Sequence, residues 1–215
     1  MYVICGVDEA GKGSVLGPLV IAAVGVSSED VFSDVAVKDS KLLSPAVRED
    51  LYSVIRKRFR VATVRIDAHE IDEIRRQMTM NSCIARAHAQ VIGKLSPTQA
   101  FVDACDVNAF RYAEMVKSHL ECSCEIISEH HADETFKVVS AASIVAKVIR
   151  DRAIVTLSKK YGAIGSGYPS DPVTISFLSS YIDEYKIPPP IARKSWKTVS
   201  FMIGKKEQSH LSKFF

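Results

Sequence analysis

The run Gly6-Val7-Asp8-Glu9-Ala10-Gly11-Lys12-Gly13 decides how the rest of the chain is interpreted. The apolar segment that leads into it, residues 2–7, is typical of a buried strand, and a glycine-rich turn follows the two acids. Successive side chains of a strand point to opposite faces, so adjacent acids share one site only where the strand stops. The glycines let backbone amides approach whatever the carboxylates hold. Acids and bare amides together suit a divalent metal that bridges to a phosphate or a sugar.

The composition indicates a single domain of an intracellular protein. The chain has 215 residues, of which 47% are hydrophobic, enough to bury a substantial core. A net charge of +3 permits a nucleic-acid partner without arguing for one. The five cysteines form no Cys-x-x-Cys pair, which argues against a disulfide framework and a zinc site. With no signal peptide and no long apolar run, we expect a cytoplasmic monomer that does not contact membranes.

The hydrophobic patterns predict an α/β domain with a mixed sheet. Strands are expected at residues 2–7, 16–26, 59–66, 99–103 and 122–127. Helices are expected at residues 45–57, at 68–77 after an Asp67 cap, after an Asn81 cap through residue 95, at 107–120, at 136–161, and from Asp171-Pro172 to the prolines at 188–190. Because strands come first and then alternate with helices, a sheet flanked by helices is favoured. We expect one domain over residues 1–204 and a flexible tail over 205–215.

Four carboxylates, those of Asp8, Glu9, Asp103 and Asp133, are candidates for one catalytic metal site. Two divalent ions that cleave a phosphodiester need several acids to balance their charge, and oxygen ligands suit Mg²⁺ or Mn²⁺. Each acid also has a plainer interpretation, because Asp103 could sit in a turn and Asp133 could cap a helix. Asp106 is a better helix cap than ligand. Spacing alone does not choose among Asp103, Asp106, Asp133 and Glu134.

Several further segments resemble one family, the type 2 ribonucleases H (ribonuclease HII). The opening resembles its Asp-Glu-Ala-Gly-Arg-Gly motif, residues 38–44 its Asp-Ser-Lys segment, and Phe101-Val102-Asp103 its third acid strand. Residues 129–133 and 139–151 match another of its signatures, and residues 165–172 and 193–196 resemble its archaeal and eukaryotic branch. The resemblance therefore touches nearly the whole chain in order.

The resemblance implies a fold, a reaction and a ligand set. The fold is a ribonuclease H-like mixed sheet flanked by helices, with a helical C-terminal extension at about residues 171–204. The reaction is hydrolysis of the RNA strand of RNA–DNA hybrids, and of ribonucleotides embedded in DNA, leaving 5′-phosphate and 3′-hydroxyl ends. Carried over position by position, the four acids that bind two Mg²⁺ or Mn²⁺ ions fall on Asp8, Glu9, Asp103 and Asp133.

Ribose recognition is expected at the glycine turn. Telling RNA from DNA requires contacts to a 2′-hydroxyl, and glycines expose backbone groups for them. The resemblance implies that Gly11, Lys12 and Gly13, together with Tyr168, bind the junction between a ribonucleotide and a deoxyribonucleotide. Lys12 stands where the family carries arginine, so a bidentate contact is lost while backbone contacts survive. Lys41 and Lys147 are candidate phosphate contacts.

The C-terminal residues carry a separate motif. Gln208, Leu211, Phe214 and Phe215 have the spacing of the peptide with which replication enzymes bind a ring-shaped sliding clamp. One turn of helix would put Leu211, Phe214 and Phe215 on one face, where two exposed phenylalanines need a receiving pocket. The alternative is that they fold back onto the enzyme's own core.

Two other functions remain open from the residues alone. A phosphotransferase of the actin and sugar-kinase type also opens with a strand, an aspartate and a glycine turn, but it needs a second domain for adenosine. A non-catalytic nucleic-acid binding module recruited by a clamp would keep the tail, although four carboxylates without metal repel a phosphate backbone.

Overall fold

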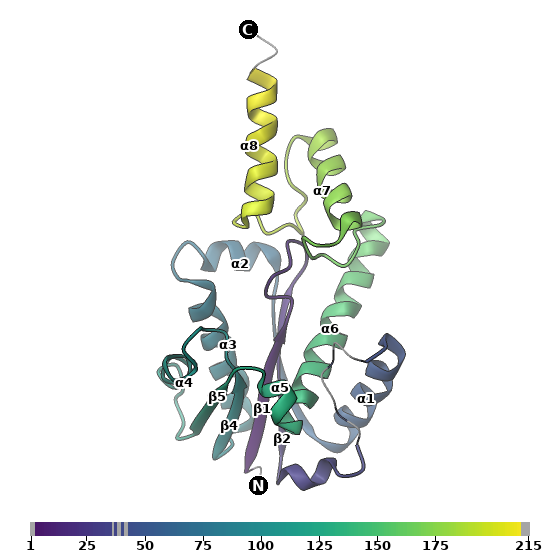
Figure 1. Ribbon diagram of the computed structural model, residues 1–215. Helices are drawn as coiled ribbons and strands as arrows, with labels where there is room; N and C mark the ends of the chain where they lie inside the picture. The colour runs from purple at the N-terminus through teal and green to yellow at the C-terminus, as the bar shows by residue number, and fades with distance from the viewer. Residues whose placement is uncertain (1–2, 36, 38–39, 41–42, 212–215) are drawn as a thin grey trace. The chain divides into compact units, whose positions relative to one another are not determined.

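A computed structural model describes residues 3–35, 37, 40 and 43–211, with side chains described as far as residue 204. Within these ranges the strands are β1 (Ile4–Ala10), β2 (Leu19–Val26), β3 (Arg60–Ile66), β4 (Gln99–Asp103) and β5 (Glu125–Glu129). The helices are η1 (Glu29–Phe32), α1 (Pro45–Arg58), α2 (Ala68–Ile74), α3 (Met80–Leu95), α4 (Ala109–Lys117), α5 (Ala132–Thr135), α6 (Lys137–Tyr161), α7 (Pro172–Tyr185) and α8 (Lys197–Leu211). The predicted α/β class with a mixed sheet flanked by helices is confirmed (Figure 1).

The sheet has the order β3-β2-β1-β4-β5, so β1 is its central strand. β1 pairs antiparallel with β2 over all seven of its residues, from Ile4↔Val26 to Ala10↔Val20. It pairs parallel with β4, and this ladder stops at Val7↔Val102. β4 continues parallel to β5 as far as Asp103↔Glu129. β1 and β4 therefore stop pairing just before Asp8 and Glu9 on β1 and just before Asp103 on β4.

The chain divides into two compact units, each with its own apolar core. The first unit comprises residues 1–10, 20–65 and 78–150 and holds the sheet. In it α3 and α4 cover one face of the sheet, and α1 and the first half of α6 cover the other (Figure 1). The approach of β1 to α6 is close, because a Cβ on Gly6 would lie 2.3 Å from the backbone carbon of Val138. A glycine is required there because only its missing side chain lets strand and helix backbones meet.

The second unit comprises residues 11–19, 66–77 and 151–215. Its core is an apolar cluster from the segment after the glycine turn, the second half of α6, α7, α8 and the loops between them: Val15, Leu16, Ile154, Ile164, Leu178, Ile191, Ala192 and Val199. The expected helical extension at about residues 171–204 lies entirely in this unit. The expected single domain thus contains two compact bodies.

Helix ends differ from the sequence predictions in identifiable ways. α3 is capped by Thr79, whose hydroxyl accepts the amide of Ser82 at 3.2 Å, and not by Asn81. α4 is capped by Asn108 rather than Asp106, because the Asn108 side chain accepts the amide of Arg111 at 2.9 Å. In both cases two polar residues compete for one cap, and periodicity does not choose between them. The helix α8 also continues past residue 204 to Leu211, into the segment expected as a tail.

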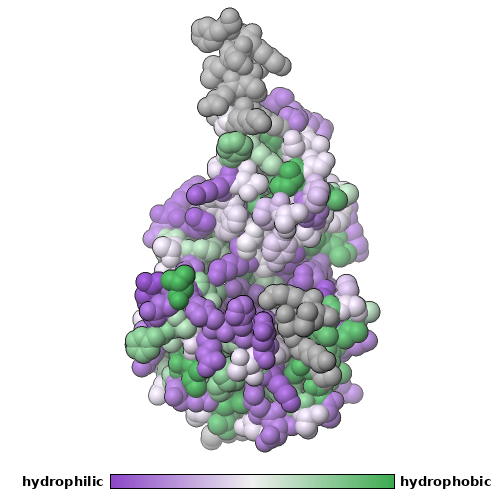
Figure 2. All heavy atoms as spheres, viewed as in Figure 1, coloured by the Kyte–Doolittle hydropathy of each residue, from purple (hydrophilic) through white to green (hydrophobic). Residues whose placement is uncertain are grey.

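The surface and the cysteines agree with the composition. On the face shown in Figure 2, hydrophilic side chains separate the exposed apolar ones into small groups, as is normal for protein surfaces. All five cysteines are free thiols, as predicted. No helix in the described ranges combines the length and apolar character needed to cross a membrane.

Candidate active site

Asp8 and Glu9 lie on β1 just beyond its ladder with β4. The sequence predicted that the first strand stops at residue 7. β1 instead continues to Ala10, paired with β2. The two acids therefore point to opposite faces of the strand. Asp8 is 6% exposed and accepts a hydrogen bond from Ser143 of α6, whereas Glu9 reaches His88 of α3. Asp8 and Glu9 therefore lie on opposite faces of the sheet, just beyond the last residue pair of β1 and β4.

Electrostatic repulsion from neighbouring acids acts on Asp8. Its burial raises its pKa well above the ordinary value, and the charges of Glu9 and then Asp103 raise it further. Hydrogen bonds from Ser143 and from the Glu9 amide, the latter at 2.7 Å, oppose that rise without cancelling it. Three predicted acids thus lie close enough for their charges to interact. Such a group is stabilised by a bound cation, since each negative charge disfavours the others.

Asp103 is connected to the segment that carries Asp133. Its Oδ1 accepts the backbone amide of Ala132 at 3.0 Å, and Ala132 directly precedes Asp133 at the start of α5. Asp133 is 3% exposed, and Ser140 of α6 donates to its carbonyl at 2.5 Å. Asp133 does not cap the long helix α6, because it lies inside the short helix α5. The N-cap residue of α5 is His131.

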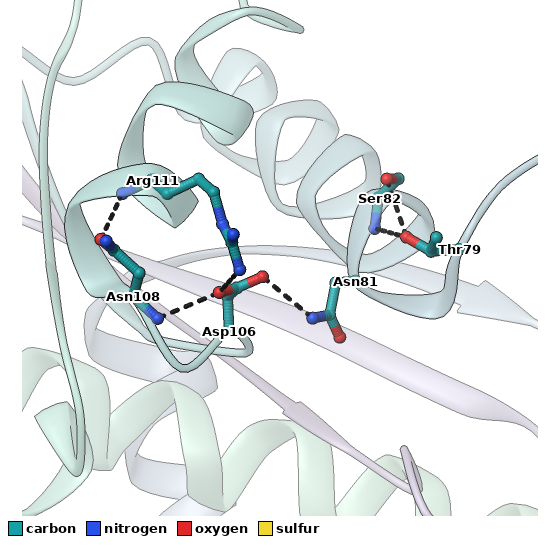
Figure 3. A network of polar contacts seen from close by, with 6 residues as sticks. All are labelled: Thr79, Asn81, Ser82, Asp106, Asn108 and Arg111. Carbon is teal, nitrogen blue, oxygen red and sulfur yellow. Dashed lines mark hydrogen bonds and ion pairs between the residues drawn. The ribbon is translucent and has the colours of Figure 1, made fainter.

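The two competing acids are engaged elsewhere. Figure 3 shows Asp106 in a network in which it accepts from the Asn108 amide at 3.0 Å, from the Asn81 side chain at 3.2 Å, and from Arg111. The Asn108 and Arg111 hydrogen bonds lower the pKa of Asp106. Glu134 is exposed and lies 3.4 Å from His131. Asp106 fixes the loop that follows β4, and Glu134 faces outward.

Glu9 is surrounded by residues that the sequence did not single out. The Cys105 thiol donates to its Oε1 at 3.0 Å, and Nε2 of the fully buried His88 lies 3.3 Å from its Oε2. The Tyr112 hydroxyl lies 3.2 Å from Nδ1 of the same imidazole. The one signal in the sequence was a histidine on the apolar face of the predicted helix ending at residue 95.

The glycine turn belongs to the second unit and is held there by Arg193. This fully buried side chain donates twice to the carbonyl of Gly17, at 3.2 and 3.1 Å, and once to that of Lys12, at 3.1 Å. Gly11 has a φ of 92°, which favours glycine. Gly13 is exposed, and a Cβ there would meet nothing within 4 Å. Arg193 therefore holds the backbone of the turn through the Lys12 and Gly17 carbonyls, while the turn is exposed at Gly13.

Tyr168 lies in a loop bound to the same segment. The carbonyl of its neighbour Gly167 accepts the amides of Val15 and Leu16, at 2.8 and 3.1 Å. The Gly167 amide in turn donates to the Thr174 hydroxyl at 2.9 Å. The half-buried Tyr168 is therefore anchored beside the residues that follow the glycine turn, within one unit.

The other predicted site residues are more scattered. Lys147 is half-buried on α6, in the first unit. Lys41, Phe214 and Phe215 lie outside the described residues. Gln208 and Leu211 belong to α8, with only their backbone described.

The donor set suits a hard divalent cation. The four acids offer carboxylate oxygens only, which is the chemistry that Mg²⁺ and Mn²⁺ prefer. Within the described ranges no three His, Cys, Asp or Glu side chains already converge tightly enough to enclose one ion. The side chains of Asp8 and Glu9 lie on opposite faces of β1.

Comparisons with known proteins agree with this arrangement. The family model described as Ribonuclease HII matches residues 5–199. The chain belongs to the ribonuclease HII family. Ribonuclease HII of Methanoregula boonei is 66% identical over 212 residues, covering 99% of this chain and all of that protein. The crystal structure of the ribonuclease H2 from Pyrococcus horikoshii superposes with a TM-score of 0.88 at 39% identity, covering 95% of this chain and 99% of that one.

A second solved structure, that of the PCNA:RNase HII complex from Archaeoglobus fulgidus, has a TM-score of 0.85 at 40% identity and covers 91% of this chain and 95% of that one. As a ribonuclease HII, this chain is a metal-dependent endoribonuclease that hydrolyses the RNA strand of RNA–DNA hybrids and ribonucleotides embedded in duplex DNA. The phosphotransferase and the non-catalytic module are thereby excluded as its function.

Proposed function

We propose that Asp8, Glu9, Asp103 and Asp133 are the catalytic residues of this ribonuclease and together hold two ions of Mg²⁺ or Mn²⁺. The observation that carries the proposal is the Asp8 carboxylate, whose pKa is raised by its burial and then by the charges of its neighbours Glu9 and Asp103. Such crowding is unfavourable in a fold unless a cation balances it. When bound, two divalent ions stabilise the attacking and the leaving oxygens of a phosphodiester.

The protein's own contribution is to fix the carboxylates before substrate arrives. Ser143 donates to Asp8, the Ala132 amide donates to Asp103, and the Asp106 network holds the loop between β4 and α4. These contacts orient oxygens that otherwise repel one another. The products, a 5′-phosphate and a 3′-hydroxyl, follow from attack of water on the phosphorus with departure of the 3′ oxygen.

The decisive experiment is a nicking assay on duplex DNA that contains one ribonucleotide. We expect one nick on the 5′ side of the ribonucleotide with Mg²⁺ or Mn²⁺, and none with Asp103→Asn or Asp133→Asn. Glu134→Gln is the matched control, because it neutralises the exposed acid beside Asp133 and should leave the rate unchanged. Equal loss in Asp133→Asn and Glu134→Gln would contradict the assignment of Asp133.

We propose that the glycine turn and Tyr168 recognise the ribose. The open front of Gly13 gives a sugar access to backbone groups, which Arg193 holds in place from behind through the Lys12 and Gly17 carbonyls. A 2′-hydroxyl both donates and accepts hydrogen bonds, so backbone amides and carbonyls can distinguish it from hydrogen. Tyr168 offers a ring for stacking and a hydroxyl for a polar contact.

Lys41 and Lys147 are proposed to contact the phosphate backbone. Ser40, which precedes Lys41, shares a 2.8 Å hydrogen bond with Ser143, the residue that also donates to Asp8. Cleavage by Lys41→Gln and Lys147→Gln variants, measured against salt concentration, tests this. Loss of a phosphate contact weakens substrate binding and flattens its salt dependence.

We propose that the C-terminal motif binds a sliding clamp. The Archaeoglobus fulgidus protein was solved in a complex with PCNA. In the present chain, Gln208, Leu211, Phe214 and Phe215 have the spacing of a clamp-binding peptide. Calorimetry of the full chain with an archaeal PCNA should show binding that a Phe214→Ala/Phe215→Ala variant loses. Phe201→Ala is the matched control, because Phe201 is a 70% exposed phenylalanine of α8 outside the motif. Light scattering on the free protein tests the expected monomer.

A further inference from the structure

A buried polar cluster surrounds Glu9 on the α3 face of the sheet. The cluster consists of Glu9, His88, Cys105 and Tyr112, which come from β1, α3, the loop after β4, and α4. Each oxygen of the Glu9 carboxylate has its own neighbour: the Cys105 thiol at 3.0 Å from Oε1, and Nε2 of His88 at 3.3 Å from Oε2. Polar groups are seldom buried this deeply without a partner or a task.

The tautomer of His88 follows from its two neighbours. In the tautomer that carries its hydrogen on Nε2, the nitrogen nearest the Glu9 carboxylate, Nδ1 is an acceptor. The Tyr112 hydroxyl, 3.2 Å away, supplies the matching donor. Burial raises the pKa of Tyr112, and the charges of Cys105 and Glu9 and a hydrogen bond with Cys105 raise it further. A series of side-chain contacts therefore leads from the Tyr112 hydroxyl through His88 to Glu9.

The position of Cys105 is fixed by the residue after it. Asp106 is tied to the side chain of Asn81 on α3 and to the amide of Asn108 before α4 (Figure 3). The loop between β4 and α4 is thereby fastened to the same helix that carries His88. The two neighbours of Glu9 are thus held by one framework, although they lie seventeen residues apart in the sequence.

We propose that His88 and Cys105 are positioning residues that hold the Glu9 carboxylate in its orientation for metal binding, with Tyr112 fixing the tautomer of His88. The proposal rests on the assignment of Glu9 as a metal-binding acid. A glutamate side chain has several rotatable bonds, and ordering them before the cation arrives removes that cost from binding. Partners of this kind act through the ligand and do not contact the metal themselves.

The test compares two amides at position 88. In His88→Gln the amide nitrogen reaches the place of Nε2 and can still donate to Glu9, whereas in His88→Asn it reaches only the place of Nδ1. We expect His88→Asn to lower kcat and raise the Mn²⁺ concentration for half-maximal activity, each by about 10–100-fold. KM for the hybrid should change less than about twofold, because ground-state binding is untouched. His88→Gln should recover most of both losses.

The same contrast is available at position 105. Cys105→Ser keeps a hydroxyl that donates to Oε1, and Cys105→Ala removes the donor. If His88→Asn does not fold, this pair carries the test, with the same expectation for kcat and for Mn²⁺. Equal kinetic parameters for the donor and non-donor variants at both positions would overturn the proposal.

Two measurements without substrate separate this proposal from the assignment of the active site. The unfolding midpoint is measured for His88→Asn, Glu9→Gln and the double variant, and calorimetric titration with Mn²⁺ alone gives the metal affinity. Coupled midpoints together with Mn²⁺ affinity lowered by His88→Asn support the proposal. Additive midpoints or unchanged affinity overturn it. Wild-type protein that binds Mn²⁺ but does not cleave would instead refute the proposed catalytic assignment.

Discussion

Replacing Gly6 by alanine should displace the central strand from α6. The added Cβ would lie 2.3 Å from the carbonyl carbon of Val138 and 2.4 Å from both the Val138 oxygen and the Val139 nitrogen. Ordinary contacts of this kind begin at 3.4 Å, so strand and helix must separate by about 1 Å. The obstacle is backbone and cannot rotate away. Because Gly6 is paired with Val24 on one side and Phe101 on the other, a shift of β1 disturbs both ladders.

The magnitude follows from two opposing terms. Overpacking of this kind costs about 3 kcal/mol, near the upper end of the usual range, when no side chain can move aside. Removing a glycine from a strand restores about 0.5–1 kcal/mol through the unfolded chain. We therefore expect Gly6→Ala to lower the free energy of unfolding by about 2–2.5 kcal/mol. With a urea m-value of about 2–3 kcal/mol/M, the midpoint falls by about 1 M.

Urea unfolding should be followed by circular dichroism. The single tryptophan, Trp196, lies in the second unit, so its fluorescence reports on a different body from the one that contains Gly6. Gly93→Ala is the matched control, because a Cβ on this exposed glycine of α3 meets nothing within 4 Å. Helix propensity predicts that the control gains about 0.5–1 kcal/mol. If Gly6→Ala unfolds at or above the wild-type midpoint, the close approach of β1 to α6 is not as described.

Three further outcomes are expected. Asp8 has a raised pKa in the folded protein, so the folded state holds its proton to higher pH than the unfolded state does; stability of the metal-free enzyme should fall as pH rises from the ordinary carboxyl range through that raised pKa. Asp8→Asn should therefore stabilise the metal-free protein at neutral pH by about 1–3 kcal/mol in calorimetric unfolding, and equal stability at all pH values would contradict this. Gly13→Ala should leave the unfolding midpoint within about 0.5 kcal/mol of wild type, because its Cβ meets no protein atom, while reducing kcat/KM at a single embedded ribonucleotide more than on long hybrid. Arg193→Lys should cost about 1–3 kcal/mol of stability, because lysine cannot make the paired contacts to the Gly17 carbonyl, and should weaken the same ribonucleotide preference.

The sequence predicted the elements well because their patterns are local. The runs of apolar residues located the five strands of the described sheet to within a few residues, and the predicted starts at Asp67 and Asp171 are the caps of α2 and α7. Thr79 and Asn81 show where local rules stop: both are good caps, and the choice depends on Asp106, which takes the Asn81 amide and lies 25 residues further along the chain. When two candidate caps lie within two residues of each other, tertiary contacts decide which of them caps the helix.

The candidate site was predicted less evenly, for a physical reason. Carboxylates at strand ends leave a signal, so the sequence singled out Asp8, Glu9 and Asp103 as candidates, and the family resemblance was needed to choose Asp103 and Asp133 over Asp106 and Glu134. The side chains that hold them leave almost none. His88 contacts Glu9 across 79 positions of sequence, and Ser143 reaches Asp8 across 135. Such contacts depend on how β1 lies between α3 and α6, which no local pattern encodes.

Under the proposed assignment, the two faces of β1 have different roles in the reaction. Asp8 faces α6, where burial and then the charges of Glu9 and Asp103 raise its pKa. Glu9 looks toward α3, where His88 and Cys105 fix its direction. The glycine turn that follows β1 belongs to the other compact unit. Substitutions at His88 should consequently change metal activation without changing the preference for ribose, and Gly13→Ala should do the reverse. A variant at either position that changed both would mean that metal binding and ribose recognition are not separable in this enzyme.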